Sequence, residues 1–125
     1  MYLLRNESKK GLGFFEANNF YPDFILWILE GEKQYITFID PKGIRNLKGL
    51  GDPKIQLFKY LQTDVAAQLG NPNLVLNSFI ISNTPMEQVE FWAREQLAAK
   101  EFTNNHVLFQ DDADYMETLV RMVLA

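Results

Sequence analysis

The sequence of 125 residues contains no cysteine and a single histidine. The lack of cysteine excludes disulfide bonds, thiolate zinc sites and cysteine nucleophiles together, and it fits a reducing cytosol. No apolar run approaches the roughly 20 residues of a membrane-spanning helix, and the N-terminus lacks the apolar stretch of a signal peptide. These absences predict a soluble, cytoplasmic protein that does not contact a membrane.

Motifs of several large enzyme classes are also missing from the sequence, namely a P-loop, a dinucleotide-binding fingerprint and a nucleophile elbow. No repeat, low-complexity tract or linker divides the chain, and its length fits one domain. Hydrophobic residues make up 47% of the sequence and aromatic residues 14%. This content supports a core that buries roughly two-thirds of the unfolded chain's surface. We therefore expect a single domain over residues 1–125.

The sequence lacks an excess of positive charge, with a formal net charge of −4. Charge is nevertheless unevenly distributed, because residues 1–60 contain nine of the twelve Lys and Arg residues and seven of the sixteen acids. Basic residues cluster from residue 42 to residue 59, namely Lys42, Arg45, Lys48, Lys54 and Lys59. They predict a phosphate-binding face, although an ordinary solvated surface explains them equally well.

The clearest local pattern is a β-hairpin. Residues 23–29 form a nearly continuous apolar run, and residues 34–40 are rich in β-branched and aromatic side chains. The intervening residues 30–33 contain Gly31 followed by Glu32, and glycine at the first central position suits a type II′ turn. Apolar residues on both faces indicate central strands that are covered on both sides.

The rest of the chain alternates between predicted helices and strands. In chain order we expect a helix over residues 52–69, a strand over 74–82, a helix over 84–100, a strand over 107–109 and a helix from 111. Asp52-Pro53 and the capping-box pattern of residues 84–87 mark the first two helix starts. Tyr2–Arg5 fits the end of a further strand. The order β-β-α-β-α-β-α predicts an α/β or α+β domain with a mixed sheet flanked by helices.

Two acids occupy matching positions on the predicted hairpin. Asp23 lies eight residues before Gly31, and Asp40 lies eight residues after Glu32. Facing residues have Cβ atoms about 4.5–5.5 Å apart, so these carboxylates would repel unless a positive charge lay between them. Lys42 points to the same face if the strand continues.

Two facing acids and a lysine suit phosphodiester hydrolysis. Carboxylate oxygens bind Mg²⁺, the metal activates a water, and the lysine positions that water or stabilises the transition state. The alternative is that Asp23 and Asp40 end strands for local hydrogen-bonding reasons, and a register error of one residue would separate them. The spacing alone leaves both interpretations open.

Pro22-Asp23 followed by Asp40-Pro41-Lys42 resembles the signature of the PD-(D/E)xK nuclease superfamily, which carries its aspartate at the start of one strand and its acid-x-lysine near the end of the next. Gln56 and Tyr60 resemble the glutamine-x-x-x-tyrosine element of RecB-like nucleases, although an ordinary amphipathic helix explains them equally well. Residues 14–24 and 38–43 are similar to the C-terminal nuclease region of type III restriction subunits and related helicase-nucleases.

The resemblance covers roughly residues 1–60 and implies a restriction-endonuclease-like fold and a Mg²⁺-dependent DNA endonuclease, with Mn²⁺ as an alternative metal. Asp23 and Asp40 would hold the metal, and Lys42 would be catalytic. The implied partners are DNA and a helicase or ATPase motor on the same native chain, of which this domain would be a fragment. The implied supporting residues are Glu16, Gln56 and Tyr60, and the expected DNA contacts are Arg45, Lys48, Lys54 and Lys59.

Two features depart from the family pattern, since Asp40 replaces the commoner glutamate and Pro41 stands between the acid and the lysine. Outside the motif, we assign His106 a structural or surface role. Asp111, Asp112 and Asp114 have the composition of a helix N-terminus, with a metal site as the alternative. Two rival functions remain, a catalytically inactive nuclease-like module that binds nucleic acid or protein, and a purely structural domain of a larger complex.

Overall fold

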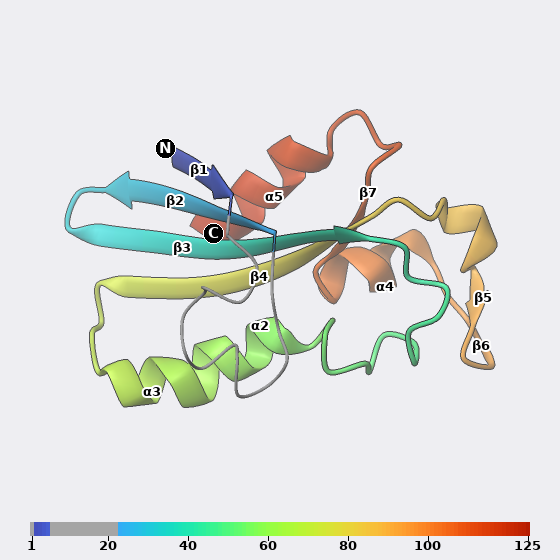
Figure 1. The fold of residues 1–125 in the computed structure, drawn as a ribbon, viewed down its shortest axis with the longest axis horizontal. Helices are drawn as coiled ribbons and strands as arrows, with labels where there is room; N and C mark the ends of the chain where they lie inside the picture. The colour runs from blue at the N-terminus through green and yellow to red at the C-terminus, as the bar shows by residue number, and fades with distance from the viewer. Residues whose placement is uncertain (1, 6–22) are drawn as a thin grey trace.

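A five-stranded mixed sheet forms the centre of the computed structural model, which describes residues 2–5 and 23–125. Its order is β1-β2-β3-β4-β7. The β1–β2 and β2–β3 pairs are antiparallel, whereas β4 runs parallel to both β3 and β7 (Figure 1). The strands are β1 (Tyr2–Arg5), β2 (Phe24–Glu30), β3 (Lys33–Lys42), β4 (Leu74–Ser82) and β7 (Val107–Phe109).

The hairpin of β2 and β3 confirms the predicted register. Its pairing runs from Phe24 opposite Ile39 to Glu30 opposite Lys33. Gly31 has a φ of 63° in the connecting turn, a conformation that glycine adopts without steric cost. β3 continues two residues beyond its predicted end, through Pro41 to Lys42. Proline is tolerated there because the described pairing with β2 ends at Ile39, so that Pro41 lies on an edge segment with β4 as its neighbour.

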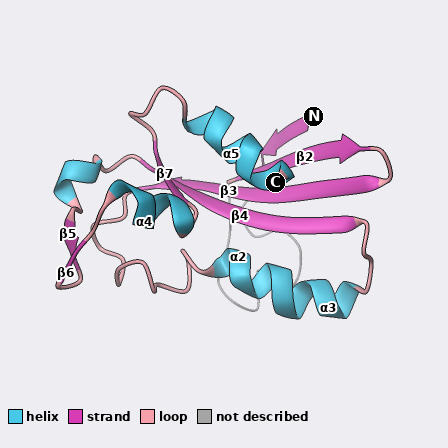
Figure 2. Cartoon of the chain, turned by 180° about the vertical axis from the view of Figure 1, so that it is seen from behind, coloured by secondary structure: helices cyan, strands magenta, loops and turns pink. Residues whose placement is uncertain are grey.

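Helices cover both faces of the sheet (Figures 1 and 2). On one face lies a continuous helical segment made of α2 (Leu57–Tyr60), the π-helical η1 (Leu61–Val65) and α3 (Ala66–Leu69). On the other face lies α5 (Tyr115–Leu124). Within the described ranges, no helix combines the length and the apolar character needed to cross a bilayer.

Each face of the sheet has its own core, because side chains alternate along the strands. Phe38 of β3 packs with Leu57, Leu61 and Val65 of the helical segment. Ile39, the next residue, packs with the α5 core on the other face. Leu61 and the α5 residue Leu119 are fully buried, and each such side chain stabilises the fold by about 1.5–3 kcal/mol.

The first helix begins at Leu57, later than the predicted start at Asp52-Pro53, because residues 53–56 form turns that are organised by the buried Asp52 carboxylate. Its Oδ1 accepts a hydrogen bond from the Lys54 N–H (2.9 Å), and its Oδ2 accepts one from the Lys48 N–H (3.0 Å). The Asp52 carbonyl also accepts the Gln56 N–H. This carboxylate therefore ties the loop after β3 to the first turn before α2, and the helical segment ends, as predicted, at Gly70 with a φ of 60°.

The predicted helix over residues 84–100 is wrong. The chain instead forms a 3₁₀ turn η2 (Met86–Gln88), a small hairpin of β5 (Phe91–Trp92) and β6 (Glu95–Gln96), and a short helix α4 (Ala99–Asn104). Thr84, the predicted cap, accepts the N–H of Ile44 on its hydroxyl instead. Val89, Trp92 and Leu97 are buried in a core with Phe102. Their spacing in the sequence resembles that of a helix, but they reach the core from a turn, a strand and a loop.

Gly49 allows the loop after β3 to pack closely against the turn of this hairpin. It has a φ of 97°, and a Cβ built on it would lie 2.8 Å from the Cβ of Ala93. We expect Gly49→Ala to lower the free energy of unfolding by about 1–3 kcal/mol, because both the backbone conformation and the contact disfavour a side chain. Gly51→Ala is the matched control, since no described atom lies within 4 Å of its added Cβ. Urea denaturation of both variants tests this, and equal stabilities would contradict the close packing of the loop on the hairpin.

Candidate functional site

The end of β3 carries the acid and the lysine of the predicted motif on one face. Asp40 and Lys42 follow Phe38 at two-residue steps, so they extend the face that packs against α2. Lys42 Nζ lies 2.7 Å from Asp40 Oδ2, and the two side chains are 25% and 26% exposed. The strand therefore brings Asp40 and Lys42 together in a half-buried ion pair, despite the intervening Pro41.

Asp23 stands directly before β2, next to the Phe24–Ile39 pair. Continuing the register by one step puts it opposite Asp40, and its side chain is exposed. The charge of Asp23 contributes to raising the pKa of Asp40, so the two carboxylates interact electrostatically. Glu16, the upstream acid implied by the resemblance, lies outside the described residues.

Asp40 is held in an unfavourable electrostatic environment. Burial raises the pKa of its carboxyl above the usual value of 3.8. The hydrogen bond and the charge of Lys42 oppose this rise, Asp23 adds to it, and Lys54 opposes it more weakly. A carboxylate in this situation gains from a further nearby cation.

Gln56 and Tyr60 lie at the two ends of the first helical turn. The Gln56 Nε2 donates hydrogen bonds to the Leu50 carbonyl (2.6 Å) and to Asn105 Oδ1 (2.9 Å). Its Oε1 is buried without a hydrogen-bond partner among the described residues. Tyr60 packs, partly buried, against the α2 core. Gln56 thus joins the loop to the residues before β7, a link to Asn105 that no local pattern in the sequence indicates.

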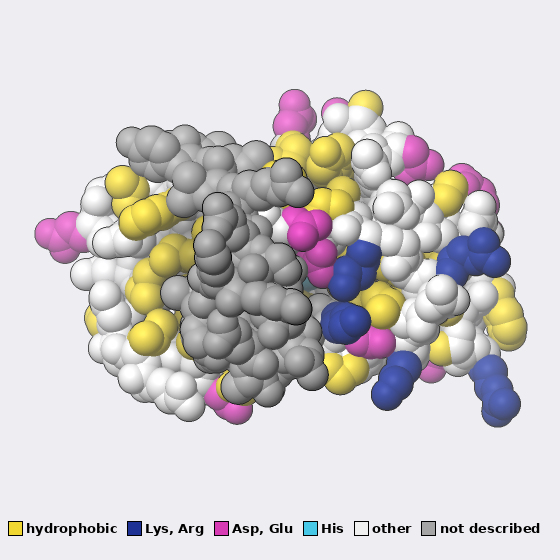
Figure 3. Space-filling view, in the orientation of Figure 1, with side chains coloured by type: hydrophobic (Ala, Val, Ile, Leu, Met, Phe, Trp, Pro, Cys, Tyr) yellow, Lys and Arg dark blue, Asp and Glu magenta, His cyan; other side chains and the backbone are white. Residues whose placement is uncertain are grey.

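The basic residues expected to contact DNA have exposed side chains. Arg45 Nη1 lies 3.4 Å from Gln88 Oε1, and Lys59 Nζ lies 5.8 Å from the centroid of the Phe58 ring. Lys48 and Lys54 lie in the loop that Asp52 organises. Figure 3 shows Lys and Arg side chains gathered on one half of this face, beside acidic side chains near the start of β2. Arg45, Lys48 and Lys54 all belong to the loop that follows the Asp40–Lys42 pair.

His106 has a structural role, as expected. Its ring stacks between those of Phe58 and Phe79, with centroid distances of 3.7 and 4.4 Å. Its Nδ1 lies 3.0 Å from the Ser78 carbonyl, which fits a donor at Nδ1. Burial lowers the pKa of His106 below its usual value of 6.5, so the imidazole is neutral at pH 7.

The acids before the last helix form a turn, and α5 begins at Tyr115, four residues later than the predicted start at Asp111. Asp112 Oδ1 accepts the N–H of Asp114 at 3.0 Å, which stabilises the turn locally. No group of three or more His, Cys, Asp or Glu side chains that could hold a metal occurs within residues 2–5 and 23–125. A metal bound at Asp40 would therefore have few ligands from the described part of the chain.

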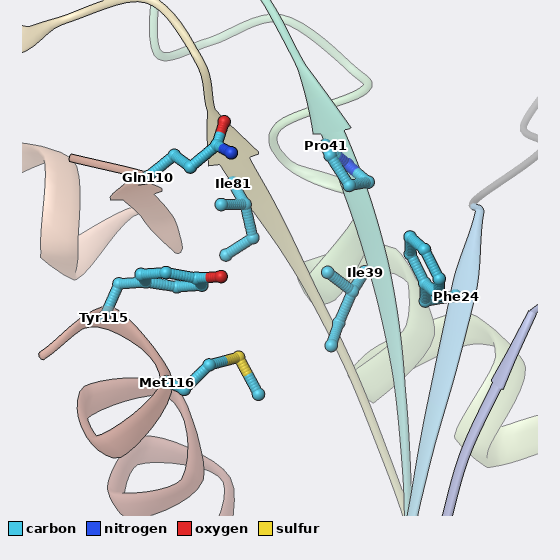
Figure 4. A pocket seen from close by; sticks show the side chains of 7 residues that line it. All are labelled: Phe24, Ile39, Pro41, Ile81, Gln110, Tyr115 and Met116. Atoms are coloured by element: carbon cyan, nitrogen blue, oxygen red, sulfur yellow. The ribbon is translucent and has the colours of Figure 1, made fainter. Parts of the chain in front are cut away.

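A separate cavity of about 200 Å³ lies behind the ion pair, on the α5 face of the sheet. Pro41 lines it, whereas its neighbours Asp40 and Lys42 belong to the opposite face. Figure 4 shows the Tyr115 ring and the Gln110 amide among the otherwise apolar side chains of this cavity. None of the described residues that line it is charged, so this lining differs chemically from the ion-pair face.

Comparisons of the chain with protein-family models, with curated proteins and with solved structures found no match.

We expect Asp40→Asn to preserve or increase stability at pH 7. The folded state binds the Asp40 proton more readily than the unfolded state, so the wild-type protein loses stability as the pH rises from 3.8 through the raised pKa. Asparagine removes this loss and can still accept a hydrogen bond from Lys42. Thermal unfolding across this pH range measures the effect, with the exposed Glu117→Gln as the control for charge. A large loss of stability in metal-free buffer would instead assign Asp40 a structural role.

Proposed function

We propose that the chain is a metal-dependent endodeoxyribonuclease domain of the PD-(D/E)xK type, which hydrolyses phosphodiester bonds of DNA. The observation that carries this proposal is the half-buried Asp40–Lys42 pair on one strand face, with the charge of Asp23 acting on the same carboxylate. An acid-x-lysine pair beside a second acid on the neighbouring strand is the arrangement that the sequence motif requires.

The donor groups fit Mg²⁺. Asp23 and Asp40 offer hard carboxylate oxygens, and the raised pKa of Asp40 reflects a buried carboxylate that an added cation would stabilise. Mg²⁺ usually takes one or two carboxylates from the protein and completes its shell with waters and substrate phosphate. Two protein ligands therefore suffice, and Mn²⁺ accepts the same oxygen donors.

Each residue has a separate task in this proposal. Asp23 and Asp40 hold the metal, which when bound activates a water and neutralises charge on the phosphate. Lys42 keeps its ammonium beside Asp40 and donates hydrogen bonds to the attacking water or to a phosphate oxygen. Lys54, whose charge reaches Asp40, attracts the DNA backbone toward the same carboxylate.

The wider assignment extends the proposal to the fold and its context. A mixed sheet with helices on both faces is compatible with a restriction-endonuclease-like fold. In the proposed context, this domain is the cleavage module of a type III restriction-like or helicase-associated enzyme. Arg45, Lys48 and Lys59 have exposed side chains and accordingly become phosphate contacts. Cleavage of plasmid DNA that requires Mg²⁺ or Mn²⁺ and disappears in Asp40→Ala would distinguish this enzyme from a non-cutting module.

Substitution of Lys42 distinguishes a nuclease from a domain that only binds metal. We expect Lys42→Ala to leave Mg²⁺ affinity unchanged or slightly higher, because a positive charge beside Asp40 is removed. Cleavage should fall on the order of a hundredfold or more, the usual effect of losing one electrostatic stabiliser. Lys42→Arg should restore little, because a planar guanidinium does not reproduce the position of a compact ammonium.

The measurement combines calorimetric metal titration with a cleavage assay on the same variants, including a form that carries the native flanking sequence. Lys100→Ala on α4 is the matched control, since its exposed side chain lies outside the proposed site. An undiminished cleavage rate in Lys42→Ala would remove Lys42 from the mechanism and, with it, the main support for this family.

A further inference from the structure

The β5–β6 hairpin has a strained turn made of two residues other than glycine. Ala93 has a φ of 53° and Arg94 a φ of 68°. Two successive residues with positive φ are typical of a type I′ turn, which strongly favours asparagine and glycine. Backbone strain of this kind persists only where the surrounding structure enforces it, and it is concentrated at functional segments. The turn therefore holds Arg94 in a backbone conformation that has a steric cost.

The surrounding core holds the hairpin in place. Trp92 is buried in the core beside Phe102, and the Leu97 N–H donates a hydrogen bond of 2.6 Å to the Glu90 carbonyl. Gly49 allows the loop after β3 to approach Ala93 closely. The hairpin is thus anchored to the core through the buried side chains of Trp92 and Leu97.

Phe91 is left outside this core. Its side chain is 67% exposed, more than that of any other large hydrophobic residue among the described residues. Phe91 pairs with Gln96 and Trp92 pairs with Glu95, so the face that carries Phe91 has a neutral polar neighbour and Glu95 lies on the other face. An exposed aromatic ring whose cross-strand partner is a neutral polar residue is suited to stacking against another planar group.

Basic side chains connect this hairpin to the proposed cleavage site. Lys48 precedes the Gly49 that contacts the turn, and Arg45 lies within hydrogen-bond reach of Gln88 just before the hairpin. At the other end of the loop, the carbonyl of Lys42 accepts the Asn83 N–H. In Figure 3, Lys and Arg side chains extend over the part of this face that carries the loop and the hairpin. The exposed side chains of Arg45 and Lys48 therefore lie on the loop between Lys42 and the hairpin.

We propose that the β5–β6 hairpin binds the DNA substrate, with the Phe91 ring stacked on an unpaired base and Arg94 on a neighbouring phosphate. The inference rests on the proposed function for its nucleic-acid chemistry, and it specifies the substrate, which must contain single-stranded nucleotides close to the cleaved bond. Aromatic stacking is tolerant of base sequence because every base has a π face, and an exposed ring with flanking cations is the usual means of single-strand binding. Stacked bases of an intact duplex would not be accessible to Phe91.

The test compares binding of a fluorescently labelled oligothymidylate strand and of a duplex, by anisotropy in metal-free buffer so that no cleavage occurs. Phe91→Leu keeps an apolar side chain without a π system, and it should weaken single-strand binding by about tenfold while changing duplex binding little. Phe91→Trp should preserve single-strand binding. Leu69→Ala, at another exposed apolar side chain, is the matched control and should have no effect.

Arg94→Gly removes the charge and suits the positive φ, so it tests the phosphate contact without disturbing the turn. It should weaken binding to both DNA forms and lower the slope of log affinity against log salt by about one. Arg121→Gln on α5 controls for the general loss of a positive charge. Unchanged salt dependence in Arg94→Gly would contradict the phosphate contact.

The outcomes separate this inference from the proposed nuclease function. Wild-type DNA cleavage combined with undiminished single-strand binding in Phe91→Leu would overturn the role of the hairpin and leave the nuclease intact. Weakened single-strand binding in Phe91→Leu, without cleavage by the wild-type protein in Mg²⁺, would support the hairpin and overturn the nuclease. No binding of the wild-type protein to single-stranded DNA would overturn the inference, as would a Phe91→Leu defect confined to association with another protein.

Discussion

The pairing of β2 with β3 determines both the two cores and the position of the charged side chains. Side chains alternate between the faces of a strand, so a shift of one residue would exchange all of them. In the observed register Phe38 belongs to the α2 core and Ile39 to the α5 core. The same shift would turn Asp40 and Lys42 toward the apolar core that α5 covers. Burial of the two cores therefore holds this acid–lysine pair on the α2 face.

Burial of the apolar cores stabilises the fold, but it also partly removes the Asp40 carboxylate from solvent. Burial disfavours this carboxylate, and Lys42 compensates only in part, since the pKa of Asp40 remains raised. The proposed metal ion would supply positive charge beside this carboxylate.

The sequence predicted those parts of the fold and site that depend on neighbours in the chain. Gly31 determines the hairpin turn, the turn determines the register, and the register brings Asp40 and Lys42 to one face. The prediction of a helix over residues 84–100 failed because the apolar residues of this segment are buried against distant parts of the chain. The Thr84 hydroxyl accepts a hydrogen bond from the Ile44 N–H and does not cap a helix. Such contacts across 40 residues leave no periodic signal. The strained turn at Ala93 was unpredictable for the same reason, since its support comes from Gly49.

The loop between β3 and α2 links the two regions to which we assign the proposed functions. At its start it follows the Asp40–Lys42 pair, and at Gly49 it contacts the turn of the β5–β6 hairpin. The buried Asp52 carboxylate binds backbone N–H groups on both sides of itself, which limits movement of the loop. Because both of its ends are fixed to the core, the distance from the ion pair to the hairpin is set by the fold. A fixed separation of this kind is what a surface needs in order to hold one polymeric ligand at two points.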